Sequence, residues 1–301
     1  MLTTRTLARA LGVSESSLKR WADEGRIRAT RTAGGHRRIT VAEAVRFIRA
    51  SDAPLAQPGL LGLADLASAP DDLFVAEAQA ERLCEHLRSG RSREARALIL
   101  GLYLRGQSVA AIADGPIREA MRQLGELWRH DEAGVFVEHR ATEICTQAVQ
   151  QIALLIEQPA EGMVAIGGAP RRDPYLLPTL LATSALKNEG VQAVNLGPNT
   201  PFEALHEAVR QHRPALVWLS VSHAEEPRKL EQELTRLARS LGEAGVMLVL
   251  GGQALHKLHA VRGDNIHIGQ SMAELVAFAK GLQAANAPIL CPSTTGERAK
   301  S

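Results

Sequence analysis

The first 50 positions carry hydrophobic residues at helical spacing in two short segments separated by a glycine. Leu7 and Leu11 lie on one face of the first segment, as the period of an amphipathic helix requires. Gly12 ends this segment, and Ser14 is a suitable N-cap for a second helix that turns Trp21 inward. Two short helices joined by a glycine-containing turn are typical of a helix-turn-helix unit.

A hairpin and a third helix complete this N-terminal module, which is strongly basic. The paired glycines Gly34 and Gly35 allow a tight turn, and the amphipathic segment 41–50 predicts a helix. Residues 1–50 hold ten Arg and one Lys against three Glu and one Asp, a formal net charge of +7, and the rest of the chain carries −5. A basic module on an acidic body favours binding to a polyanion.

The stretch LGVSESSLKRW, the GGHRR tip and the helix that follows resemble the winged helix-turn-helix of MerR-type regulators. We therefore expect a DNA-binding domain over residues 1–52. The resemblance implies that the second helix enters the major groove and that the hairpin grips the DNA backbone, where phosphate contacts add affinity without reading sequence. The implied groove residues are Ser16, Ser17, Lys19 and Arg20, and the implied hairpin residues are His36, Arg37 and Arg38.

Hydrophobic periodicity is weak over residues 53–72, which are rich in Pro, Gly, Ala and Asp. This composition predicts a linker, although some of its leucines are candidates for docking on a neighbouring domain. Residues 73–158 then follow a helical period almost throughout, with glycines as punctuation. This second pattern predicts a bundle of four or five helices.

A tryptophan and a Glu-His pair stand out within the helical segment. Nine residues separate Trp128 from Glu138 and His139. Taken singly, a Trp is usually a core residue and a Glu-His pair a capping or surface feature. Their arrangement resembles the helical cap of CarH-type light-sensing regulators, in which these residues surround the upper face of a corrinoid. In that family a cobalt-binding His follows the Trp, whereas here the position is Arg129.

From residue 163 onward, short apolar runs alternate with helical segments. Five runs are predicted strands: MVAIGGA, VQAVNLG, ALVWLSVS, VMLVLGG and NIHIG. This alternation predicts a doubly wound, five-stranded parallel α/β domain of Rossmann-like type over residues 160–285, followed by a flexible tail over residues 286–301. No glycine-rich dinucleotide fingerprint or phosphate loop is present, which argues against a nucleotide-dependent enzyme.

The α/β domain resembles the cobalamin-binding module of methionine synthase, corrinoid methyltransferases and CarH-type regulators. The motif there reads Asp-x-His-x-x-Gly, then Ser-x-Leu, then Gly-Gly, and the matching positions here are Asp173, Tyr175, Ser220, Gly251 and Gly252. In that family the His binds cobalt from below, the Asp orients the His, and the nucleotide tail of the cofactor threads a cavity between sheet and helices. The resemblance therefore implies a cofactor-binding face at the strand ends.

Two positions depart from that pattern, because Tyr175 stands for the His and Pro178 for the motif Gly. A neutral phenol, with a pKa of about 10, is a poor cobalt ligand. Three outcomes stay open: cobalamin, as adenosylcobalamin, with its own benzimidazole or no lower ligand; another flat tetrapyrrole such as haem or a bilin; or no cofactor. No metal ligands are assigned.

The remaining composition bears on compartment and class. Cys84, Cys145 and Cys291 have neither disulfide nor metal spacing, which favours a reduced, cytoplasmic protein, and no apolar run is long enough for a membrane span. We expect a non-enzymatic, sequence-specific transcription regulator, a repressor by resemblance, that binds operator DNA as a homodimer or tetramer and responds to a ligand or light. The alternative is a corrinoid subunit that carries methyl groups for an enzyme.

Overall fold

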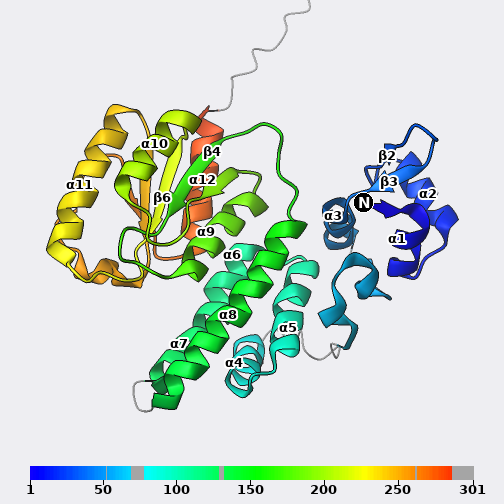
Figure 1. The fold of residues 1–301 in the computed structure, drawn as a ribbon. Coiled ribbons are helices and arrows are strands. Elements are labelled where there is room, and N and C mark those ends of the chain that lie inside the picture. The colour runs from blue at the N-terminus through cyan, green and yellow to red at the C-terminus, as the bar shows by residue number, and fades with distance from the viewer. Residues whose placement is uncertain (52, 69–77, 129–131, 262, 287–301) are drawn as a thin grey trace, which may run out of the picture.

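The computed structural model describes residues 1–301 apart from 52, 69–77, 129–131, 262 and 287–301. Its elements fall into an N-terminal head, a helical domain and an α/β domain, which lie in a row with the helical domain in the middle (Figure 1). The expected order of helix-turn-helix, helical bundle and doubly wound α/β sheet is confirmed.

The head consists of β1 (Leu2–Thr3), α1 (Thr4–Leu11), α2 (Glu15–Asp23), β2 (Thr30–Arg31), β3 (Arg37–Ile39) and α3 (Val41–Ser51). Its strands form an antiparallel sheet in the order β1-β3-β2. Gly12 adopts a φ of 68° between α1 and α2, a conformation that favours glycine. Ser14 Oγ accepts the Ser17 N–H at 3.0 Å and caps α2. Trp21 packs on Phe47 with ring centroids 5.2 Å apart, so the indole supports the head from inside.

A buried carboxylate, Glu43, ties α3 to the segment before the hairpin. Its Oε1 accepts the Arg28 backbone N–H at 2.7 Å, and its Oε2 accepts Arg46 Nε at 2.7 Å. Burial by itself raises the pKa of the Glu43 carboxyl, but hydrogen bonds from Arg46 and Arg28 outweigh burial and hold this pKa below its ordinary value. A carboxylate with a lowered folded-state pKa stabilises the fold above its unfolded-state pKa, and this stabilisation is lost as the pH falls through the folded-state pKa.

Glu43→Gln is expected to lower the free energy of unfolding at neutral pH by about 1–3 kcal/mol, because it removes the charged acceptor of two guanidinium groups. Urea unfolding followed by circular dichroism at neutral and acid pH measures this. The variant should lose less stability on acidification than the wild type does. The matched control Glu24→Gln changes an exposed carboxylate, and we expect a change below about 0.5 kcal/mol. Identical pH dependence in Glu43→Gln and wild type would contradict the assignment.

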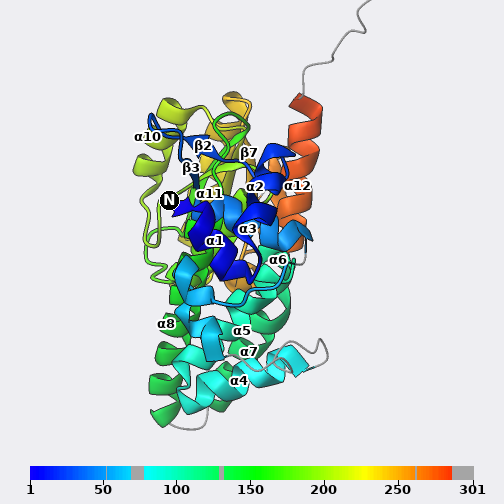
Figure 2. The ribbon, with the colours of Figure 1, turned by 90° about the vertical axis from the view of Figure 1, so that its right-hand side faces the viewer.

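Residues 53–68, which the sequence suggested to be part of a linker, pack against the domains on either side. This strap contains two short 3-10 helices, η1 (Pro58–Leu61) and η2 (Ala64–Ser68). Leu61 and Leu63 are buried in the same core as α1 and α5, so leucines of this segment do dock. The Gln57 N–H donates to the Ala10 carbonyl at 3.0 Å. The strap therefore passes from beneath α1 to the helical domain as packed structure (Figure 2).

The helical domain consists of α4 (Gln79–Ser89), α5 (Ser92–Leu104), α6 (Val109–Ile112), a π-helical turn η5 (Ala113–Ile117), α7 (Arg118–Trp128) and α8 (Glu132–Leu155). The helix α5 is buried along most of its length, which places it in the centre of the bundle. Within the part of the chain that the structure describes, no helix combines the length and the apolar character that a membrane span requires.

The α/β domain consists of β4 (Val164–Gly168), α9 (Leu176–Asn188), β5 (Gln192–Asn195), α10 (Phe202–His212), β6 (Leu216–Ser220), α11 (Pro227–Glu243), β7 (Met247–Gly251), η6 (Gln253–Lys257), β8 (Ile266–Ile268) and α12 (Met272–Asn286). Its five strands are parallel in the order β5-β4-β6-β7-β8. The helices α9 and α12 pack on one face of the sheet, and α10 and α11 pack on the other (Figure 1). All strands therefore end at the same edge, where the loop before α9 lies.

The three parts are joined by one hydrophobic core that runs from α1 and α3 through α5 and α8 to α9. Polar contacts reinforce both joints. Asp114 of the helical domain accepts the N–H groups of Met272 and Ala273 at 2.9 and 2.8 Å and so caps α12. Arg49 of the head places its guanidinium 3.8 Å from the Tyr103 ring centroid and donates to the Tyr103 carbonyl. The head is thus held against the helical domain.

Candidate functional site

The polar residues expected at DNA from the second helix lie on α2. Ser16, Lys19 and Arg20 are exposed. Ser17 is half-buried, and its hydroxyl lies 2.8 Å from Ser14 Oγ in the helix cap. Figure 1 shows α2 on the side of the head that faces away from the helical domain, while α3 faces it. This arrangement leaves the outer face of α2 open to a large partner.

The hairpin β2–β3 lies beside α2 and is attached to it. His36 is exposed at the turn, and Gly35 takes up a φ of 78° there. Arg37 forms an ion pair with Asp23 at the end of α2, which fixes the hairpin relative to that helix. Arg38 is half-buried and pairs with both neighbouring strands. The hairpin therefore places its basic residues beside the surface of α2.

Asp173 lies in the loop between β4 and α9 and is completely buried. Its Oδ2 accepts the N–H groups of Ser222 and His223 at 2.6 and 2.9 Å, and its Oδ1 accepts the Tyr175 N–H at 3.2 Å. Burial raises the pKa of the Asp173 carboxyl, and the three backbone donors oppose that rise. The Asp173 carbonyl also accepts the Asn199 N–H at 2.8 Å. One residue thus holds together the loops that follow β4, β5 and β6.

Tyr175 and Pro178 occupy the start of α9. Tyr175 is 41% exposed and is the N-cap residue of the helix. Pro178 stands at the third helical residue, where the backbone N–H has no partner inside the helix and proline is tolerated. Asp173 has both carboxylate oxygens engaged by backbone donors, and Tyr175, two residues further on, offers a phenol. This loop therefore does not provide an imidazole oriented by a carboxylate.

Ser220, Gly251 and Gly252 lie close together at the ends of β6 and β7. Ser220 is buried and pairs with Gly251 in the parallel register. Gly252 has a φ of 111°, and a Cβ on it would lie 2.3 Å from the Val221 carbonyl oxygen. A side chain is therefore excluded at Gly252 by the approach of the neighbouring loop. A Cβ on Gly251 would make only an ordinary contact, 3.5 Å from the Gly269 carbonyl oxygen.

The residues implied for an upper cofactor face are on α7 and α8. His139 Nδ1 lies 2.9 Å from the Val135 carbonyl oxygen and 3.1 Å from Glu138 Oε2, so its imidazole is tethered to its own helix. Glu138 Oε1 also accepts the Thr142 hydroxyl at 3.1 Å. Trp128 is the last residue of α7, but its side chain, like all of Arg129, lies outside the described residues.

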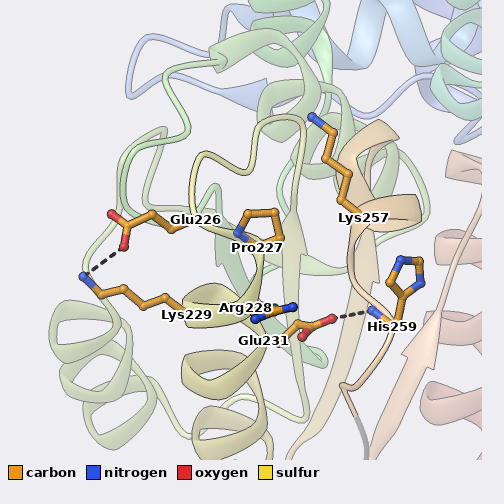
Figure 3. A pocket seen from close by; sticks show the side chains of 7 residues that line it. All are labelled: Glu226, Pro227, Arg228, Lys229, Glu231, Lys257 and His259. Atoms are coloured by element: carbon orange, nitrogen blue, oxygen red, sulfur yellow. Dashed lines mark hydrogen bonds and ion pairs between the residues drawn. The ribbon is translucent and has the colours of Figure 1, made fainter.

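Two further features of the described residues bear on ligands. They contain no group of three or more His, Cys, Asp or Glu side chains that could hold a metal ion. An open depression of about 600 Å³ lies at the start of α11, lined by Glu226, Pro227, Arg228, Lys229, Glu231, Lys257 and His259 (Figure 3). Two contacts join its lining residues: Lys229 pairs with Glu226 at 3.7 Å, and Glu231 accepts the His259 backbone N–H.

Sequence reasoning missed one residue that shapes this region, Trp218 on β6. The indole is 2% exposed and packs in the cluster between the sheet and the helices α9 and α12. The strand period could have placed it, because Trp218 and Ser220 are two residues apart and so face the same side of the sheet.

The comparisons with known proteins agree with this architecture. Residues 1–51 match the helix-turn-helix domain family, and residues 79–153 match the B12 binding domain family. The fold of the helical and α/β domains is that of the monomethylamine corrinoid protein of Methanosarcina barkeri, with a TM-score of 0.53 and 17% identity over 69% of this chain and 100% of that one. The domains thus define a helix-turn-helix transcription regulator with a sensor region of the cobalamin-binding type.

A particular relative of this class aligns with nearly the whole chain. It is the HTH-type transcriptional repressor CarA of Myxococcus xanthus, 28% identical over 282 residues, which cover 92% of this chain and 96% of the relative. The expected resemblance to a regulator that joins a DNA-binding head to a cobalamin-binding-like domain is confirmed.

Proposed function

We propose that the protein is a transcription repressor that binds operator DNA through α2 and the β2–β3 hairpin. The observation that carries this proposal is the outer face of the head, where exposed Lys19 and Arg20 lie beside a basic hairpin fixed by Arg37 and Asp23. Ser16, Ser17, Lys19 and Arg20 contact base edges, whereas His36, Arg37 and Arg38 lie along the phosphates. The similarity to the CarA repressor also supports a role in transcriptional repression.

The sensor region controls how the heads are presented. The head shares a core with the helical domain and is held there by Arg49, so the relative position of two heads follows from how two sensor regions associate. A cytoplasmic dimer or tetramer, changed by a ligand or by light, then alters multivalent binding to the operator. The sensor ligand is a cobalamin, another flat tetrapyrrole or, if neither, a protein partner.

A methyl-carrying corrinoid subunit is the rival function, and the fold alone is compatible with it. That chemistry needs a cobalt ion that is coordinated and redox-cycled by an oriented ligand. Tyr175 offers a phenol in place of an imidazole, and Asp173 is engaged by backbone donors. We therefore propose a regulator without enzymatic activity.

Electrophoretic retardation of the DNA upstream of the protein's own coding sequence tests the DNA-binding function. Arg38→Ala is expected to weaken binding at all sequences and to reduce the slope of log K against log salt by about 1, because one phosphate contact is lost. Arg20→Ala should also reduce discrimination against unrelated DNA. The matched control Arg210→Ala removes an exposed arginine of α10, and we expect no change. Absence of any sequence-dependent shift at moderate salt would refute the proposal.

A further inference from the structure

The largest completely buried side chain of the α/β domain, Trp218, lies on the face of the sheet that α9 and α12 cover. In the parallel register Trp218 is opposite Gly167 of β4. A Cβ on Gly167 would be only 2.2 Å from Trp218 Cδ2 and 2.4 Å from Cε2. The indole ring therefore lies across Gly167, which must lack a side chain for the ring to fit.

The ring belongs to a hydrophobic cluster that combines four alanines with larger side chains such as Leu186, Leu216 and Leu275. The cluster around it contains Ala165 of β4, Ala182 of α9, Ala193 of β5 and Ala279 of α12, all of them buried. Because these alanines, on two strands and two helices, have short side chains, there is room between the sheet and the helices for one bicyclic side chain. Without the indole, the volume of its ring would be empty, on the same face of the sheet as Ser220, two residues further along β6.

The helix above this space has little freedom to move outward. On the side of α9 away from the sheet, Leu177, Leu181 and Ala185 belong to the core that α5 and α8 form. The Asp114 cap fixes the start of α12 in the same way. Because both covering helices are held by the helical domain, the space cannot widen around the indole to admit a second ring system.

The indole nitrogen of Trp218 is in an unusual environment. Trp218 Nε1 is buried and has no hydrogen-bond partner, although a buried indole N–H usually finds one. Indole and benzimidazole share the same fused five- and six-membered ring shape. In the cobalamin-binding modules that this domain resembles, the nucleotide tail, which ends in a benzimidazole, enters between sheet and helices.

We propose that Trp218 permanently fills the space that an inserted benzimidazole tail would need, so that a corrinoid bound by this protein keeps its tail outside the α/β domain. The residues present therefore do not fit cobalamin in the form with an inserted tail and a protein lower ligand. Tyr175 is one obstacle to that form, and Trp218 is an independent second one. The inference concerns the interior of the α/β domain and holds whether or not the head binds DNA.

The test compares Tyr175→His with the double variant Tyr175→His/Trp218→Ala, each produced with histidine labelled by the heavy isotope of nitrogen. Electron paramagnetic resonance of added cob(II)alamin reports the lower ligand: the cofactor's own benzimidazole splits the lines into triplets, and a labelled His splits them into doublets. We expect doublets only in the double variant, with at least about tenfold tighter cobalamin binding than in Tyr175→His. Doublets in Tyr175→His alone would overturn the proposal.

Circular dichroism decides whether the double variant is folded, and Trp218→Val replaces Trp218→Ala if it is not. A folded double variant without doublets would also overturn the proposal. A second measurement uses free benzimidazole and the single variant Trp218→Ala. Benzimidazole should raise the melting temperature of Trp218→Ala and leave that of the wild type unchanged, since a cavity lined by small apolar residues takes up a matching ring. No difference between the two proteins would count against the proposal.

Discussion

Gly252→Ala is expected to destabilise the α/β domain by about 2–5 kcal/mol, through a strained backbone and an overlap with the neighbouring loop. Gly252 has a φ of 111°, and an added Cβ would lie 2.3 Å from the Val221 carbonyl oxygen and 2.7 Å from its nitrogen. Neither atom can move freely, because the Val221 N–H donates to the Gly251 carbonyl at 2.7 Å and the Val221 carbonyl accepts the Ala254 N–H at 3.0 Å. Thermal or urea unfolding without any cofactor measures the loss.

The adjacent glycine is a matched control. Gly251 lacks a positive φ, and a Cβ there would be 3.5 Å from the Gly269 carbonyl oxygen, which is an ordinary contact. We expect Gly251→Ala to change the free energy of unfolding by less than about 1 kcal/mol. Equal effects at the two positions would contradict the backbone explanation. A large effect at Gly252 alone would mean that this half of the Gly-Gly motif is needed by the fold itself, independently of a cofactor.

The order of elements could be predicted from the sequence because it rests on local signals. Gly12 and Ser14 mark the turn of the head, and both act there as expected. The alternation of apolar runs with helical segments after residue 163 likewise predicted a parallel sheet. Such signals need only neighbours along the chain, so a single sequence contains them.

The packing between distant segments could not be predicted in this way. The sequence offered the leucines of the strap as candidates for docking, but it did not indicate which of them dock or where, because the burial of Leu61 and Leu63 depends on α1 and α5. The helical pattern around Arg49 did not indicate its contact with Tyr103. The Asp114 cap joins residues that are more than 150 positions apart in the sequence. Contacts of this kind depend on how elements are placed in space, which short-range periodicity does not specify.

The candidate cofactor face was likewise predictable from the sequence only in part. The motif spacing located Asp173, Ser220 and the glycine pair at the strand ends, and the structure places them there. The apolar run that contains Trp218 predicted a buried strand without revealing which space its ring fills. The sequence showed one sign of an altered cofactor face, because Tyr175 and Pro178 replace motif residues. The packing of Trp218 against Gly167 is a second sign, which only the structure provides.

Asp173→Ala is expected to lower the free energy of unfolding by about 2–4 kcal/mol, because it leaves three backbone N–H groups without their acceptor. These donors belong to Tyr175, Ser222 and His223, in the loops after β4 and β6. Hydrogen exchange should increase at these three amides before it increases elsewhere in the domain, since the loops separate first. Urea unfolding gives the size of the effect, and amide exchange gives its location.

Glu225→Ala is the control for this loop region, because Glu225 is exposed and lies 3.4 Å from Arg172 in a surface ion pair. We expect the control to change the free energy of unfolding by less than about 0.5 kcal/mol. If Asp173→Ala were equally mild, the carboxylate would not hold the loops. If Asp173→Ala strongly lowers the free energy of unfolding without any cofactor, Asp173 is needed by the fold itself. A residue whose only role was to orient a metal-binding His would have no such effect, because this chain has Tyr175 at the position of that His.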